Sequence, residues 1–112
     1  MRIAMPVQDG KLCSHFGHAP HFALVEVDPA EKRILNVQNL SAPPHAAGVL
    51  PDWLHREGVE VVLVGGIGAR AKNLLEQHGI TVLAGVPIAE PTPLVQAYLQ
   101  GSLVTAENTC DH

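Results

Sequence analysis

The hydrophobic pattern of the sequence changes near the middle of the chain, and this change limits the folds that are available to it. In the first half, three strand-like segments are separated by short turns, which favours antiparallel pairing. They cover residues 2–7, 21–28 and 33–40, with a loop expected over 11–20. In the second half, the segments 60–64 and 80–84 are almost wholly apolar, and each is followed by a helical pattern. Such an alternation predicts parallel strands that are covered on both faces.

Apolar residues at helical spacing, followed by glycine, predict the helices. The first helix begins near Val49 and ends at Gly58. The second ends at Gly79, and the third has Thr92 as its N-cap and Gly101 at its end. The whole order predicts an α/β fold of three layers, with a mixed five-stranded sheet and helices on both faces. Right-handed crossovers and strand-to-helix loops place any binding crevice at the carboxyl edge of the parallel strands.

Length and composition narrow the possible functions. The 112 residues are 46% hydrophobic and are expected to form one domain over 1–112, with a flexible tail from about residue 103. The net charge is −4 and no basic run occurs, so nucleic acid is an unfavourable partner. The apolar runs are too short to span a bilayer and no signal peptide precedes them, which predicts a cytoplasmic protein without membrane attachment. In that compartment thiols stay reduced, so Cys13 and Cys110 are interpreted as thiols or ligands.

Histidine and cysteine gather at three places, namely the loop around residues 13–21, the loop at residue 45 and the tail at 110–112. Imidazole together with thiolate suits zinc, copper, iron or metal–sulfur clusters. The spacing matches no standard zinc motif, so the alternatives remain surface histidines in the loops and a disordered tail. The candidate metal ligands are Cys13, His15, His45, Cys110 and His112, whereas His55 and His78 are predicted to be surface or helix-cap residues.

A glycine-rich turn, Gly65-Gly66-Ile67-Gly68-Ala69-Arg70, follows the buried strand at 60–64. The turn lacks the spacing of a dinucleotide fingerprint and the Gly-Lys-Ser/Thr of a phosphate loop. It is interpreted either as a purely structural turn or as a backbone cradle for an anion, including the sulfides of a metal cluster. In the second case Gly66, Ile67 and Gly68 supply N–H donors and Arg70 balances negative charge. No catalytic arrangement is apparent in the sequence, which favours a binding protein over an enzyme.

Three separated motifs resemble one known family. They are Ser14-His15-Phe16-Gly17-x-Ala19-x-x-Phe22, Gly48-Val49-Leu50-Pro51-x-Trp53-Leu54 and Gly65-Gly66-Ile67-Gly68-x-Arg70-Ala71. In this order, and over nearly the whole chain, they are similar to the dinitrogenase iron–molybdenum cofactor biosynthesis family. The tail Asn108-x-Cys110-x-His112 is similar to that of a subgroup within the family.

The resemblance implies a ribonuclease-H-like α/β/α fold without nuclease activity. It also implies binding, and transfer or storage, of an iron–molybdenum cofactor or its precursor, or of a molybdenum–copper sulfide cluster. The histidine of the His-Phe-Gly motif is a cofactor ligand in this reading and corresponds to His15, with Ser14, Phe16 and Gly17 beside the cofactor. Cys13 lies outside the general motif, so its assignment depends on its chemistry alone.

Three hypotheses follow for the function, of which a small hydrolase is the least favoured. The first is a non-catalytic carrier or store of a metal–sulfur cluster, which exchanges its cargo with donor or acceptor proteins and is a monomer or a weak homodimer. The second is a regulatory or protein-interaction module that holds a single transition-metal ion, or none. Sulfide and molybdenum in stoichiometric amounts would distinguish the first from the second.

Overall fold

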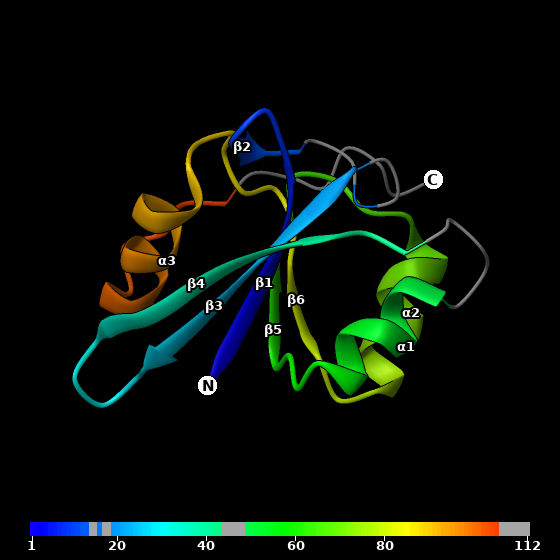
Figure 1. Ribbon diagram of the computed structural model, residues 1–112, viewed down its shortest axis with the longest axis horizontal. Coiled ribbons are helices and arrows are strands. Elements are labelled where there is room, and N and C mark those ends of the chain that lie inside the picture. The colour runs from blue at the N-terminus through cyan, green and yellow to red at the C-terminus, as the bar shows by residue number, and fades with distance from the viewer. Residues whose placement is uncertain (14–15, 17–18, 44–48, 106–112) are drawn as a thin grey trace.

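The computed structural model describes residues 1–13, 16, 19–43 and 49–105 (Figure 1). The order of its elements is as predicted except for one added strand, β2 (Lys11–Leu12), which makes the sheet six-stranded where five strands were predicted. The bounds of the elements are β1 Arg2–Gln8, β2 Lys11–Leu12, β3 His21–Asp28, β4 Arg33–Ser41, α1 Val49–Arg56, β5 Val61–Leu63, α2 Ala69–Gln77, β6 Thr81–Leu83 and α3 Pro91–Gln100. The prediction of a loop over 11–20 is wrong at β2, because a two-residue strand is too short to show an alternating pattern.

The strands in the described part of the chain form one mixed sheet. The order of its five main strands is β4-β3-β1-β5-β6. The short strand β2 pairs only with β1 and lies outside this order. The pairs β1–β3 and β3–β4 are antiparallel, whereas β1–β5 and β5–β6 are parallel. The predicted division of the sheet into an antiparallel and a parallel half is therefore confirmed.

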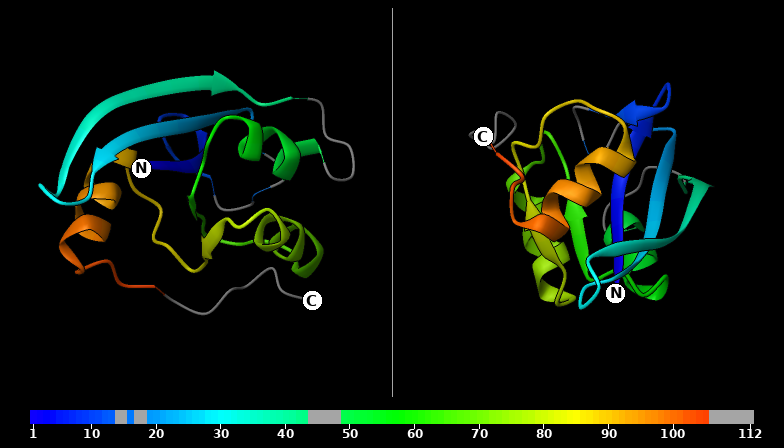
Figure 2. Two further views of the ribbon diagram at one scale, coloured as in Figure 1. Left: turned by 90° about the horizontal axis from the view of Figure 1, so that it is seen from below. Right: turned by 90° about the vertical axis from the view of Figure 1, so that its left-hand side faces the viewer.

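Alternate side chains of the central strands enter two separate cores. In β1, Ala4 faces the core beneath α1 and α2, whereas Ile3 and Met5 face the core beneath α3. The helices therefore cover opposite faces of the sheet, as Figures 1 and 2 show. This is the predicted three-layer α/β/α arrangement. The buried residues that the helices contribute are Leu50, Pro51, Leu54, Leu75, Leu94 and Val95.

The start of α3 differs from the prediction. Its N-cap is Glu90 and its first residue is Pro91, so the assignment of Thr92 as N-cap is wrong. Proline suits this position, because its fixed φ is helical and the N–H that it lacks would have no partner inside the helix. The predicted end at Gly101 is confirmed, with a left-handed φ of 73°. No helix in the described residues is both long and apolar enough to cross a membrane.

Candidate functional site

The carboxyl ends of the parallel strands β1, β5 and β6 meet at one edge of the sheet, and the segments that leave them lie close together there. The β2–β3 segment and the segment after β4, which runs parallel to β1, lie at the same edge. We call the described residues there the carboxyl rim: 13, 16, 19, 20, 42, 43, 65–68 and 84–90. In α/β sheets with parallel strands, ligands bind outside this edge. The rim is therefore where the predicted crevice belongs.

Main-chain hydrogen bonds join the segments of the rim to one another. The Phe16 N–H donates to the carbonyl of Gly66 at 3.0 Å, which links the His-Phe-Gly segment to the glycine-rich turn. The other links join the β4–α1 segment to the start of β3, the β6–α3 segment to the glycine-rich turn, and β2 to the β6–α3 segment. They are Ala42 N–H to Pro20 O (3.0 Å), Gly85 N–H to Gly65 O (2.8 Å) and Leu12 N–H to Ala89 O (2.9 Å).

A proline in β1 determines how the chain reaches the rim. β1 pairs with β5 only at Ile3 and Ala4, and Pro6 has no N–H with which to continue that ladder. Beyond this point β2 takes the place of β5 beside β1, and the Cys13 N–H donates to the Pro6 carbonyl at 2.8 Å. The chain therefore turns back from β1 and brings Cys13 and Phe16 to the end of β5.

Phe16 anchors its segment through its side chain. Only 4% of the residue is exposed, and its ring lies edge-on to Phe22, with the ring centroids 5.6 Å apart. Phe22 makes a second edge-on contact, also at 5.6 Å, with Trp53 of α1. The ring thus belongs to the core beneath α1 and α2, while the backbone of the same residue binds the glycine-rich turn.

Cys13 is the only predicted metal ligand within the described residues, and it is buried, with 7% exposed. Its Sγ lies 3.8 Å from Oε1 of Gln8, which sequence reasoning did not select. Within the described residues, no three His, Cys, Asp or Glu side chains are arranged to hold a metal ion. Six of the predicted site residues lie outside the described residues, namely Ser14, His15, Gly17, His45, Cys110 and His112.

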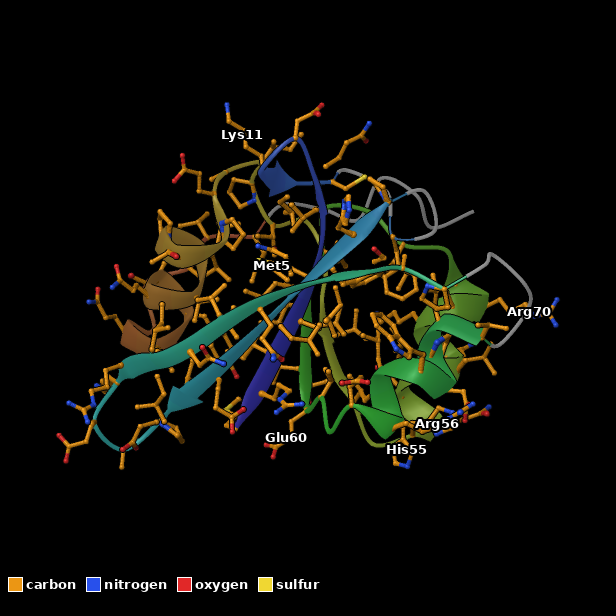
Figure 3. All side chains as sticks on the ribbon, in the orientation of Figure 1. Met5, Lys11, His55, Arg56, Glu60 and Arg70 are labelled. Carbon is orange, nitrogen blue, oxygen red and sulfur yellow. The ribbon has the colours of Figure 1, made fainter. Side chains whose placement is uncertain are left out.

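The glycine-rich turn leads into α2 without a side-chain cap. Gly68 is the N-cap residue, its φ of −71° suits any residue, and a Cβ built on it would meet no atom within 4 Å. Neither backbone strain nor crowding within the protein therefore requires glycine here. Arg70 is exposed and extends away from the molecule in Figure 3.

The segment between β6 and α3 also belongs to the rim, although sequence reasoning did not select it as part of the site. It contains Gly85, whose φ is 76°, and the exposed Ile88. It has no His or Cys, so a search for ligand chemistry passes over it. The available signal was its position after the apolar segment at 80–84, because loops after parallel strands face the crevice. That segment forms the edge strand β6, which is partly exposed and not covered on both faces as predicted.

A cavity of about 290 Å³ lies at the other end of the sheet, near the N-terminus. It is lined by charged side chains that pair with one another. Arg2 Nε lies 3.2 Å from Glu26 Oε2, and Arg2 also donates to the carbonyl of Glu57. Because these groups satisfy each other, the carboxyl rim remains the better candidate for a functional site.

Comparisons with known proteins agree with this fold. An uncharacterized protein of Methanocaldococcus jannaschii, MJ0580, is 29% identical over 85 residues, which cover 73% of this chain and 72% of that protein. The crystal structure of PH0822 superposes with a TM-score of 0.85 at 30% identity and covers 94% of both chains. The apo form of the orange protein from Desulfovibrio gigas superposes with a TM-score of 0.72 at 27% identity, over 96% of this chain and 93% of that one.

The resemblance of the three sequence motifs is confirmed by a family model, described as dinitrogenase iron-molybdenum cofactor, that matches residues 1–101. Two of the three motifs contribute to the same rim, through Phe16 and the glycine-rich turn. Because this family model matches nearly the whole chain, the protein belongs to the dinitrogenase iron–molybdenum cofactor family.

Proposed function

We propose that the protein binds a metal–sulfur cluster of the Fe–Mo–S or Mo–Cu–S kind at the carboxyl rim and carries or stores it without catalysing a reaction. The cluster is cargo, exchanged with donor and acceptor proteins. The family supports a cofactor-binding role, and the orange protein, which has the same fold, is described in its apo form.

The observation that carries the proposal is the hydrogen bond between the Phe16 N–H and the Gly66 carbonyl. His15 directly precedes Phe16 in the chain, so covalent geometry limits its Cα to about 3.8 Å from that of Phe16. In this proposal, the imidazole of His15 supplies a ligand for a borderline metal, and the backbone N–H groups of the glycine-rich turn supply hydrogen-bond donors. Cys13, which is also at the rim, adds a soft sulfur donor.

The start of α2 supports an anionic cargo. Its first N–H groups lack a side-chain cap, and the positive end of the helix dipole favours negative charge. The open space beside Gly68 admits a ligand to these groups, whereas a longer side chain would cover them. Cluster sulfides carry negative charge and accept such hydrogen bonds, as they do in other metal–sulfur sites.

The described part of the rim suits a binding role, because its side chains are largely apolar. A buried Phe16 and main-chain links give a fixed support for a cluster, which suits a protein that must hold and then release its cargo.

Anaerobic reconstitution tests the proposal. The protein is incubated with tetrathiomolybdate and Cu(I) in one sample, and with Fe(II), sulfide and molybdate in another, and is then desalted. We expect molybdenum and sulfide to remain on the protein in stoichiometric amounts in one sample, with a visible absorption band. A single bound metal without sulfide would favour the regulatory module instead, and protein without metal would contradict the carrier.

Substitution of His15 tests the placement of the site. We expect His15→Ala to weaken cluster uptake at least several-fold. The matched control is His21→Ala, which removes an exposed imidazole at the start of β3. Equal uptake by wild type and His15→Ala would remove this residue from the site, and equal losses in both variants would show that imidazoles bind the metals without specificity.

A further inference from the structure

Two histidines from different helices stack on each other far from the carboxyl rim. His55 lies in the last turn of α1 and His78 is the C-cap residue of α2. Their ring centroids are 4.7 Å apart and the ring planes differ by 25°. His55 is exposed and His78 is half-buried, so solvent reaches the pair. This contact joins residues that are 23 positions apart in the sequence and is a product of tertiary packing.

The surroundings of the pair favour a cation. Both residues stand at helix C-termini, where backbone carbonyls and the negative end of the helix dipole attract positive charge. Asp52, one turn before His55, adds a carboxylate on the same side. Its pKa is lowered mainly by a hydrogen bond from Arg56, and the charges of the two imidazoles act in the same direction.

We propose that His55 and His78 form a second metal site, which takes a divalent transition-metal ion such as Zn²⁺, Ni²⁺ or Cu²⁺ through one nitrogen of each ring. Metal–imidazole bonds are about 2.0–2.1 Å long, so both nitrogens must approach one point. The rings are stacked, so their in-plane lone pairs run nearly parallel, and one ring must rotate about its side-chain bonds before a nitrogen of each faces the same ion. Water completes the coordination, because no third protein ligand is in place within the described residues.

The second site is independent of the cluster site. α1 and α2 both run away from the rim, so their C-terminal ends lie at the opposite end of the sheet; in Figure 3, His55 and Lys11 are labelled at opposite ends of the molecule. With two protein ligands and water, the site is exchangeable and takes single ions, whereas the rim is proposed to take a cluster. A metal ion bound here links α1 to α2. It also adds one first-row transition-metal ion per chain, in addition to any metal in the cluster at the rim.

Titration with Ni²⁺ and Zn²⁺ tests the site, with the histidine ring signals followed by nuclear magnetic resonance. We expect the His55 and His78 signals to broaden together at one Ni²⁺ concentration. We also expect His55→Ala and His78→Asn each to weaken the affinity of this site at least tenfold and to abolish its share of the Zn²⁺-induced rise in Tm. Asparagine is well tolerated at helix ends, so His78→Asn keeps the fold.

The control variant is His21→Ala, in which the titration of the His55 and His78 signals should be unchanged. The proposal is overturned if either signal broadens without the other, or if His78→Asn leaves the response of the His55 signal within twofold of wild type. Because the titration follows these two rings directly, metal bound at the rim neither supports nor contradicts the site, and failure of cluster reconstitution leaves it standing.

Discussion

Replacing Phe16 by alanine separates the structural role of this residue from a direct role in binding. The ring is 4% exposed and touches Phe22 edge-on, at 5.6 Å between centroids. Truncation of such a buried ring to a methyl group costs about 3–5 kcal/mol, because buried surface is lost and a cavity remains. About 1 kcal/mol of this comes from the edge-on aromatic contact. Since small proteins have unfolding free energies of about 5–15 kcal/mol, Phe16→Ala removes a large fraction of the stability.

Urea denaturation measures this loss. With a dependence of about 2 kcal/mol per molar urea, a loss of about 4 kcal/mol lowers the midpoint by about 2 M. Phe16→Leu is the matched control, because leucine refills much of the space, and we expect its loss to be about 1.5 kcal/mol or less. A midpoint for Phe16→Ala within about 0.3 M of wild type would refute the burial argument.

The leucine variant also tests how Phe16 serves the rim. It retains the backbone N–H that binds the Gly66 carbonyl, so we expect cluster loading to be unchanged. If Phe16→Leu is stable but fails to load, the ring contacts the cluster directly, as the sequence motif suggested. Normal loading would make Phe16 a positioning residue that acts through its backbone.

Three further substitutions test other parts of the structure. Gly68→Asp should raise the free energy of unfolding by about 0.5 kcal/mol, because the aspartate caps α2. The same carboxylate should weaken binding of an anionic cluster. Urea denaturation measures the first effect and reconstitution the second, and tighter cluster binding would contradict an anionic cargo. Arg56→Gln should raise the pKa of Asp52, which Arg56 holds below its ordinary value. The stability that this pair adds is present above about pH 4 and is lost as the pH falls through the folded-state pKa of Asp52. The urea midpoint of the variant should therefore depend less on pH in the acid range. An unchanged titration of the Asp52 carboxyl would show that the pair does not form in solution. Gly101→Ala should lower the stability by about 1 kcal/mol in thermal unfolding, because alanine is strained at a φ of 73°, and an unchanged Tm would contradict that backbone conformation.

The sequence predicted the sheet and its layers because its apolar pattern is simple. In the central strands, burial on both faces leaves almost no polar residues, and the short turns of the first half leave little choice of pairing. Local capping was less predictable. Thr92 and Pro91 both suit a helix start. The choice between them depends on how α3 packs against the sheet, and the local sequence does not indicate this.

The site was predictable in outline only. The position of the rim follows from topology, and the hydrogen bond between Phe16 and Gly66 supports the joint role of two motifs that were found separately. The contact of Cys13 with Gln8 and the stacking of His55 on His78 were not predicted. Both contacts depend on how separate helices and strands pack against each other. The spacing of residues in the sequence indicates only which side chains meet within one helix or strand.

The links across the rim run from peptide group to peptide group, as in the bond from the Gly85 N–H to the Gly65 carbonyl. Every amino acid except proline can supply such a donor, and all can supply the acceptor. Exchanging exposed side chains at the rim, away from the buried Phe16 and the left-handed Gly85, therefore leaves these links in place. Such positions are a practical starting point for designing new metal-binding residues into the rim.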